Sequence, residues 1–172
     1  AMPDVPPPEE LRSERELALS VADRLPPMLR TMATAERPIE IRPINPQNPF
    51  APTRQEAHRC HWMRAQDRLP DDPLLHQCAL VFASDFALMG TAMLPHAVTF
   101  MQSNLQAASL DHSIWFHRPF RMDEWVLYEM TGPNANAGRG LNFGRIYSQD
   151  GVLVASTAQE GLMRLREVPE KY

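Results

Sequence analysis

Three polar side chains lie in segments that are otherwise mainly apolar. Asp85 lies in LVFASDFALMG, a stretch of helical character; Ser109 lies in the strand-like stretch ASLDHSIWFH; and Gln159 lies in STAQEGLM, near the end of the chain. We expect Asp85 to be buried, and a buried carboxylate is costly unless it is paired or hydrogen-bonded. If the helix packs on the strands, the three side chains can meet where helix and sheet touch.

A carboxylate, a hydroxyl and an amide can together activate a water molecule. The carboxylate of Asp85 would accept a proton from water, while Ser109 and Gln159 would hold that water by hydrogen bonds. Such a water can attack an activated carbonyl, for example a thioester, without a covalent enzyme intermediate. A purely structural interpretation stays open, in which Asp85 caps or pairs locally and the other two are ordinary strand residues.

The polar run around Ser109 is unusual for a strand that faces a core. In a regular strand Ser109, Asp111 and Ser113 share one face, because successive side chains alternate. Asp111 could then support Ser109, or it could be an exposed or structurally bonded residue. His112 would point to the opposite face, so we do not expect it to act together with Asp111.

The first part of the chain is predicted to contain a proline-rich segment, helices and two strands. The stretch PDVPPPEE is typical of an extended, solvated linker. Residues 13–35 are predicted to be helical, with a capping box formed by Ser13 and Glu16 and an interruption at Pro26-Pro27. Short strands are expected over residues 38–44 and 57–65.

The clearest helix begins after Asp72, a good N-cap, with Pro73 at the first helical position. About twenty residues follow that are mostly apolar all round, which predicts a helix buried on most sides. Strands are then expected over residues 108–117, 123–131, 138–148 and 152–166, with a tight turn at Asp150-Gly151. One long central helix wrapped by a curved antiparallel sheet is an α+β arrangement, that of the hotdog fold.

The composition limits the class of protein. The 172 residues carry a net charge of −4 and are 44% hydrophobic, which suits one globular domain and argues against a nucleic-acid binder. Two cysteines do not form a disulfide framework, so a reduced, cytoplasmic setting is the default expectation. We find no apolar run of the roughly 18 residues that would span a membrane.

The sequence gives no pattern for a cofactor or a metal. Histidines and cysteines do gather in HRCHW and HQC, where zinc is conceivable. However, their spacing forms neither a CxxC pair nor a closed tetrahedral set.

Long motifs resemble one enzyme family. The segments LPDDPLLHQCALVFASD, ASLDHSIWFHRPFRMDEWVLY and YSQDGVLVASTAQEGLMR closely resemble the acyl-CoA thioesterase II family, and the resemblance covers nearly the whole chain. Those enzymes are double hotdogs, and this chain matches the second hotdog with its preceding linker. The implied division is residues 1–36 as a tag remnant (Ala1-Met2), proline-rich linker and linker helix, and residues 37–172 as one C-terminal-type hotdog domain.

The resemblance also implies residue roles. The family's catalytic set is an Asp on the helix, a Thr or Ser on the next strand and a Gln on the last strand, which fall here on Asp85, Ser109 and Gln159. The implied activity is hydrolysis of fatty acyl-CoA to free fatty acid and CoA. Serine in place of threonine keeps the hydroxyl but loses the methyl group that restricts its rotation.

The resemblance leaves a second expectation open. The first hotdog of the family carries a Phe-Gly-Gly-Gln-like helix start, whereas the helix here starts with DDP. The chain, whether a truncated or a natural short form, would then be an incomplete half that only binds acyl-CoA or CoA, or self-associates. The expected partners are the acyl-CoA substrate and either further copies of the chain or an N-terminal hotdog domain.

Arginine and methionine side chains could contact such a substrate. Arg118, Arg139 and Arg145 could meet the phosphates of CoA, or be solvated strand residues. Met89, Met93 and Met101 could line an acyl tunnel, or be ordinary core.

Overall fold

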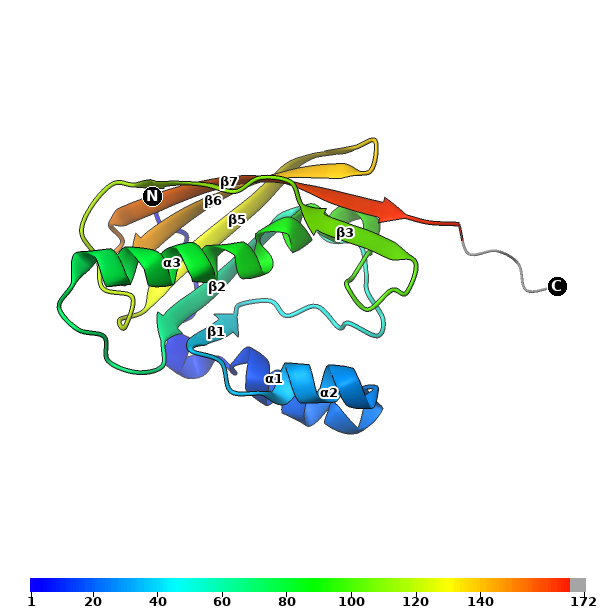
Figure 1. The fold of residues 1–172 in the computed structure, drawn as a ribbon, viewed down its shortest axis with the longest axis horizontal. Coiled ribbons are helices and arrows are strands. Elements are labelled where there is room, and N and C mark those ends of the chain that lie inside the picture. Colours follow the sequence, from blue (N-terminus) through cyan, green and yellow to red (C-terminus); the bar gives the residue numbers. More distant parts are fainter. Residues whose placement is uncertain (168–172) are drawn as a thin grey trace.

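A seven-stranded antiparallel sheet curves around one long helix (Figure 1). The computed structural model describes residues 1–167. The strand order is β1-β2-β5-β6-β7-β3, and β4 also pairs with β7. The strands are Ile39–Pro43 (β1), His58–Ala65 (β2), Leu105–Ser109 (β3), Ser113–Phe116 (β4), Val126–Asn136 (β5), Arg139–Ser148 (β6) and Leu153–Leu165 (β7). The expected α+β hotdog arrangement is confirmed.

The central helix α3 spans Pro73–Leu88 and begins as predicted, with the Asp72 side chain accepting a hydrogen bond from the Leu74 amide. Its buried side carries mainly small residues and leucines, which lets the helix lie close to the sheet. The opposite side is open, and Phe82 and Phe86 remain 52% and 39% exposed. The expectation that this helix is buried on most sides is therefore wrong, because the sheet covers only one side.

Behind α3, the core includes Tyr128, whose hydroxyl lies 3.1 Å from the Ser84 carbonyl and 2.7 Å from the Thr157 hydroxyl. This contact ties the helix to strands β5 and β7. Gly144 makes it possible, because a Cβ atom there would run into the Tyr128 ring and the Thr157 hydroxyl.

Strand β5 continues beyond its predicted end at Thr131. The added part contains Pro133, which cannot donate a ladder hydrogen bond. The sheet accommodates it by a register shift between Thr131 and Asn134. The β5–β6 hairpin then closes through Ala137 and Gly138, with φ of 51° and 73°, as a two-residue turn with positive φ at both central positions requires.

The predicted turn between the last two strands is confirmed, with Gly151 at φ 86°. The predicted single strand over residues 108–117 is instead two strands, β3 and β4, that both pair with β7. Ser109 lies opposite Gly161 and Ser113 opposite Ala158. The chain thus advances four residues from Ser109 to Ser113 while β7 advances only three. The extra residue interrupts the pairing and divides the strand in two.

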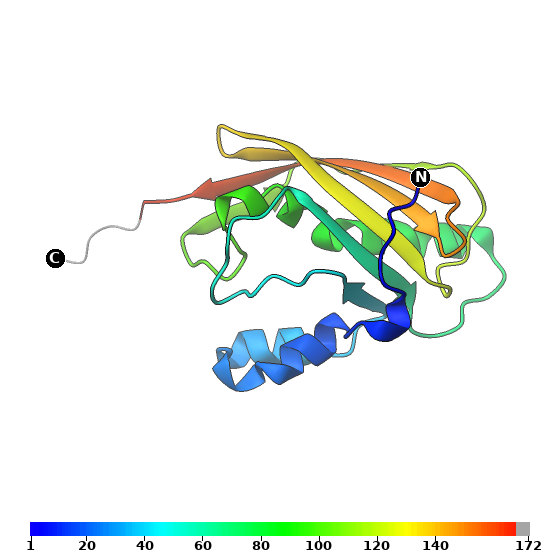
Figure 2. The ribbon, with the colours of Figure 1, turned by 180° about the vertical axis from the view of Figure 1, so that it is seen from behind.

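The N-terminal segment packs on the domain instead of extending into solvent. Residues 1–11 follow the convex face of the sheet (Figure 2), where Met2, Val5 and Leu11 pack on a cluster that includes Trp62. The Trp62 indole donates a 2.9 Å hydrogen bond to the Pro6 carbonyl. The expectation of a solvated linker is therefore wrong for this stretch.

Two short helices follow and lie beside β1 (Figure 1). Helix α1 spans Glu14–Ser20 and α2 spans Pro27–Thr34. The predicted capping box of Ser13 and Glu16 is present. The remaining helical turns are 3-10 segments at Pro8–Glu10 (η1), Ala22–Arg24 (η2), Met89–Thr91 (η3) and Leu94–His96 (η4).

By length and composition alone, the 24-residue stretch Pro73–His96 passes a test for a membrane-spanning helix. The expectation that no stretch of the chain is long and apolar enough is therefore not met. This is weak evidence for a span, because the core helix of a soluble protein passes the same test. In the structure, 56% of the 18-residue apolar stretch within this range is buried inside the fold.

Candidate active site

The three residues singled out in the sequence form one hydrogen-bonded cluster. The Gln159 side-chain nitrogen donates to Oδ1 of Asp85 and, over 3.1 Å, to Oγ of Ser109. The Ser109 hydroxyl donates to the same Asp85 oxygen over 3.4 Å. A carboxylate, a hydroxyl and an amide from α3, β3 and β7 therefore meet at one point.

The sheet register brings Ser109 and Gln159 together. Ser109 lies opposite Gly161 on β7, and Gln159 is two residues away on the same face of that strand. Gln159 is fully buried, so its side chain is held by the packing around it. It provides a fixed donor beside the more accessible Ser109.

Asp85 is not buried, contrary to expectation, since 52% of its side chain is exposed. It lies on the open side of α3, so the desolvation argument does not apply to it. Its Oδ1 atom is held by Gln159 and Ser109, whereas its Oδ2 atom makes no hydrogen bond within residues 1–167. One oxygen is thus oriented by donors and the other is free to accept a proton.

His112 is the residue of this site that sequence reasoning missed. Its Nε2 atom lies 2.9 Å from the Ser84 hydroxyl and its Nδ1 atom 3.9 Å from Oδ1 of Asp85. The alternation rule had directed it to the other face, but the strand breaks between Ser109 and Ser113. The polar run inside an apolar strand was the signal that the strand is irregular.

The hydrogen bonds of Ser84 define the role of each imidazole nitrogen. The Ser84 hydroxyl also lies 3.0 Å from the Val81 carbonyl, which can only accept. When the Ser84 hydroxyl contacts both Val81 and His112, it donates its one hydrogen to the Val81 carbonyl. The His112 Nε2 atom must then donate to the Ser84 oxygen. Its Nδ1 atom consequently presents a lone pair toward Asp85 when the ring is neutral, and a proton when it is charged.

Asp111 does not contact Ser109, as a regular strand would allow, but bonds the backbone of β7. Its Oδ1 atom accepts a 2.8 Å hydrogen bond from the Glu160 amide. The side chain thus fastens the break between β3 and β4 to β7, one residue from Gln159. It contacts the backbone that positions the cluster and not the cluster itself.

The three arginines considered for CoA phosphates each have a protein partner. Arg118 bonds the Leu153 carbonyl at 2.8 Å, Arg139 bonds Glu160 at 3.2 Å, and Arg145 bonds Glu129 at 3.0 Å. Over the described part of the chain, no group of three or more His, Cys, Asp or Glu side chains is placed to hold a metal ion.

Comparison with known proteins identifies the family. The family model described as acyl-CoA thioesterase matches residues 28–162. The chain belongs to the acyl-CoA thioesterase family. The chain is 43% identical over 166 residues to "Acyl-CoA thioesterase 2" of Haemophilus influenzae, covering 96% of this chain and 58% of that protein. It is 42% identical to human "Acyl-coenzyme A thioesterase 8", covering 96% of this chain and 54% of that one.

Solved structures agree on the fold. The crystal structure of an acyl-CoA thioesterase II, TesB2, from Mycobacterium marinum superimposes with a TM-score of 0.72 at 39% identity, over 97% of this chain and 57% of that one. A hot dog fold protein from Alicyclobacillus acidocaldarius superimposes with a TM-score of 0.65 at 20% identity, over 97% of this chain and 56% of that one. The chain thus spans little more than half the length of these relatives.

Proposed function

We propose that this chain carries the water-activating half of an acyl-CoA thioesterase site, which hydrolyses fatty acyl-CoA to a free fatty acid and CoA. Asp85 is the general base in this proposal, and Ser109 and Gln159 position the water. The observation that carries the proposal is the three-way hydrogen-bonded contact of these side chains, with one Asp85 oxygen left open.

The hydrogen-bond capacities of the cluster suit a bound water. The Ser109 hydroxyl donates to Asp85 and accepts from Gln159, and a hydroxyl oxygen has one further lone pair. A water can donate one hydrogen to Oδ2 of Asp85 and the other to that lone pair. Its own lone pair then faces outward, toward the open side of α3 where a substrate carbonyl can approach.

The proposed reaction balances with these residues. The water oxygen bonds to the thioester carbonyl carbon while its proton passes to Asp85. The carbon–sulfur bond then breaks, and the departing CoA sulfur takes the proton from Asp85. The products are the carboxylic acid and the CoA thiol, and Asp85 returns to its ionised form.

The test is release of free CoA thiol from decanoyl-CoA by the wild type and by Asp85→Asn. The amide keeps the size of the side chain but cannot accept the proton, and general-base catalysis is worth about 10²–10⁴-fold in rate. The matched control is Asp67→Asn, since Asp67 is an exposed residue outside the cluster. An Asp85→Asn variant with wild-type turnover would exclude the role of Asp85.

A second candidate function is that of an incomplete half that binds acyl-CoA without turning it over. The exposed Asp85 and the exposed phenylalanines beside it motivate this alternative, because they leave one wall of a cleft open. The family match, in contrast, supports hydrolysis. We propose that residues 37–172 form one hotdog domain, with 1–36 as its linker. A second copy, or an N-terminal hotdog, would then cover the open side of α3.

Turnover and assembly state distinguish the two candidates. If a second copy completes the site, thiol release should rise with the fraction of dimer, which light scattering measures on the same samples. The incomplete half predicts binding of decanoyl-CoA by calorimetry with no thiol release at any concentration. Added N-terminal hotdog domain of a relative would then restore turnover.

A further inference from the structure

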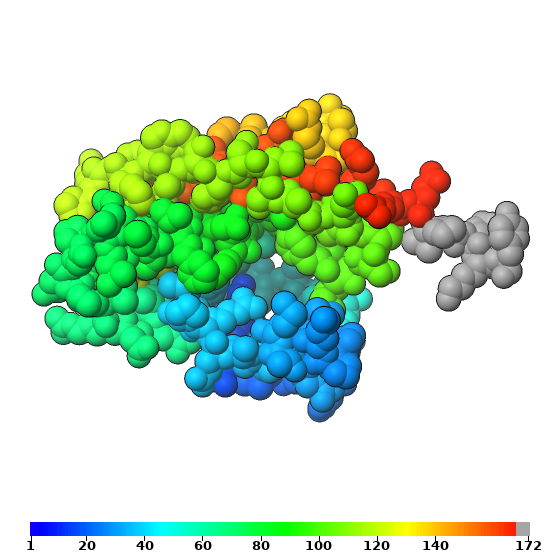
Figure 3. All heavy atoms as spheres, in the orientation of Figure 1, coloured from blue at the N-terminus to red at the C-terminus, as the bar shows by residue number. Residues whose placement is uncertain are grey.

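A large cavity lies between the N-terminal helices and the rest of the domain. It has a volume of about 1050 Å³ and is bounded by α1, β1, β2 and residues 93–101. Figure 3 shows the opening between the N-terminal helices and the rest of the molecule. Asp85, Ser109 and Gln159 do not line this cavity. Its volume is just above the range of about 300–1,000 Å³ that is usual for small-molecule sites.

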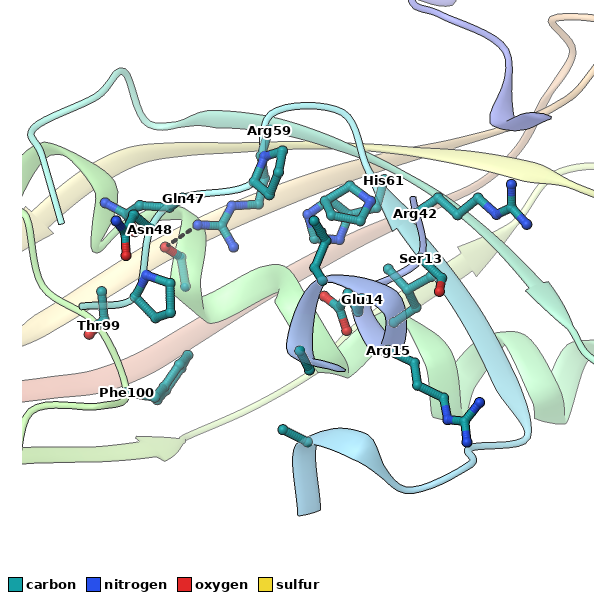
Figure 4. Close-up of a pocket in the computed structure, with 18 of the residues that line it drawn as sticks. Ser13, Glu14, Arg15, Arg42, Gln47, Asn48, Arg59, His61, Thr99 and Phe100 are labelled. Atoms are coloured by element: carbon teal, nitrogen blue, oxygen red, sulfur yellow. Dashed lines mark hydrogen bonds between the residues drawn. The ribbon is translucent and has the colours of Figure 1, made fainter. Parts of the chain in front are cut away.

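Ionisable side chains from two elements face this cavity. Arg59 and His61 lie two residues apart on β2 and therefore share a face. Glu14, the first residue of α1, faces them from the other wall (Figure 4). These three side chains take no part in the proposed hydrolysis.

Arg59 and His61 keep unused hydrogen-bonding capacity. Among the described residues, the Arg59 guanidinium bonds only the Gly90 carbonyl, at 3.3 Å, although a guanidinium has five N–H groups. His61 is only 5% exposed, and its buried Nδ1 atom has no hydrogen-bond partner in the described chain. Buried polar groups normally have hydrogen-bond partners, so a bound ligand could supply the partner that this wall of the cavity lacks.

The charge at this wall favours an anion. Burial and, to a smaller extent, the charge of Arg59 lower the pKa of His61 to about 3, so the ring is neutral. Burial raises the pKa of Glu14, while the Arg37 and Arg59 charges oppose that change. Over the whole lining, five arginines stand against four glutamates, which leaves a net charge of +1. A guanidinium with free N–H groups matches a carboxylate in shape and charge.

About half of the other residues that line the cavity are apolar. Leu17 comes from α1 and Val21 directly follows that helix, Ile41 comes from β1, and Met93, Val98 and Phe100 come from the segment after α3. Two of the three methionines considered for an acyl tunnel, Met93 and Met101, line this cavity, whereas Met89 lies against Gly161. A flexible alkyl chain suits such a surface.

We infer that this cavity is a second ligand site, which binds a carboxylic acid with an apolar chain: the carboxylate bonds Arg59 and the chain lies among Leu17, Met93 and Phe100. The inference goes beyond the proposed function and holds whether or not the chain hydrolyses thioesters. If it does, the ligand is of the same class as the acid that the reaction releases, and the site would sense product.

Calorimetric titration with decanoate tests the site, with decanol as the matched ligand that lacks the carboxylate. We expect decanoate to bind the wild type at least about tenfold more tightly than decanol, because charge-assisted hydrogen bonds to Arg59 are lost with the alcohol. Arg59→Met should remove this preference. Arg30→Met, at an exposed arginine outside the cavity, should retain it.

Three outcomes would overturn the inference: no decanoate binding, equal binding of acid and alcohol by the wild type, or an unchanged preference in a folded Arg59→Met variant. Asp85→Asn should bind decanoate like the wild type, which separates this site from the hydrolytic one. Loss of binding in Asp85→Asn would place the acid in the hydrolytic site instead.

A crystallographic measurement makes the test independent of how Arg59→Met folds. Wild-type crystals soaked with 10-bromodecanoate should give an anomalous bromine peak among Met93, Val98 and Phe100. A bromine peak beside Asp85, or none at all, would overturn the inference.

Discussion

The Nδ1 atom of His112 lies 3.9 Å from Oδ1 of Asp85, and the same ring is anchored through Nε2 to the Ser84 hydroxyl. Because Ser84 precedes Asp85 on α3, the imidazole contacts the carboxylate and the turn of helix that carries it. His112 is therefore placed to limit the orientations of Asp85, as a positioning residue for the proposed base.

We expect His112→Ala to lower kcat for decanoyl-CoA by about 10–100-fold with little change in KM. Without the ring, Asp85 gains freedom, and small misplacements of a reacting group can cost up to about 10²-fold in rate. His117→Ala is the control, since His117 bonds Ser156 away from the cluster. A wild-type kcat for His112→Ala, or a loss confined to KM, would contradict this role.

The hydroxyl of Ser109 should matter more than the rest of its side chain. We expect Ser109→Ala to lower the rate of thiol release at least about tenfold, because Gln159 and the water lose a hydrogen-bonding partner. Ser109→Thr should keep the wild-type rate or exceed it, since the methyl group restricts rotation of the hydroxyl. Equal loss in both variants would show that size, and not hydrogen bonding, decides the effect.

Gly144 should tolerate no side chain. In Gly144→Ala the new Cβ would collide with the Tyr128 ring and the Thr157 hydroxyl, both buried, and we expect a loss of about 1–3 kcal/mol in the free energy of unfolding. Urea denaturation measures this. Gly151→Asn is the matched control: it lies in open space with positive φ, which asparagine accepts. A urea midpoint for Gly144→Ala equal to that of the wild type would contradict the packing argument.

The N-terminal segment should contribute to the stability of the domain. Deleting residues 1–6 removes the Pro6 carbonyl that accepts from Trp62, together with the contacts of Met2 and Val5. We expect a lower urea midpoint and tryptophan emission shifted to longer wavelength, because Trp62 gains access to water. Substituting Asp4 and Pro7 by serine is the control. Unchanged emission after the deletion would show that this segment does not cover Trp62.

His61 should make the fold sensitive to acid. Its native pKa is held near 3 by burial and by Arg59, whereas an unfolded histidine titrates near 6.5. Below about pH 6.5, His61 is therefore protonated in the unfolded chain but stays neutral in the native state. The free energy of unfolding consequently decreases as the pH is lowered from about 6.5 toward 3. The slope from this one group approaches about 1.4 kcal/mol per pH unit.

Urea denaturation at pH 7, 6 and 5 measures that slope. His61→Gln should lose less stability between pH 7 and 5 than the wild type. The exposed His96 serves as the control through His96→Gln, which should follow the wild type. Parallel pH dependences of the wild type and His61→Gln would contradict this source of acid sensitivity.

Local rules predicted the ends of helices and turns well. The Asp72 cap, the capping box at Ser13 and the turn at Gly151 each depend on a few neighbouring residues and were read correctly. The proximity of Asp85, Ser109 and Gln159 followed from placing a helix on a sheet. These features need no knowledge of distant contacts beyond the order of the elements.

Features that depend on partner strands were not predictable in the same way. The break at residues 110–112 reflects a mismatch of one residue against β7, and it brings His112 beside Asp85. The exposure of Asp85 depends on which side of α3 the sheet leaves open. The packing of residues 1–11 depends on tryptophans that lie far along the chain.

Phe82 and Asp85 are three residues apart on α3 and so share its open face, next to Phe86. The proposed reactive carboxylate thus lies beside exposed aromatic side chains, and exposed apolar surface promotes aggregation. An engineer who replaced these phenylalanines with charged residues to improve handling would also alter the electrostatic surroundings of Asp85. On this helix, colloidal behaviour and reactivity cannot be tuned independently.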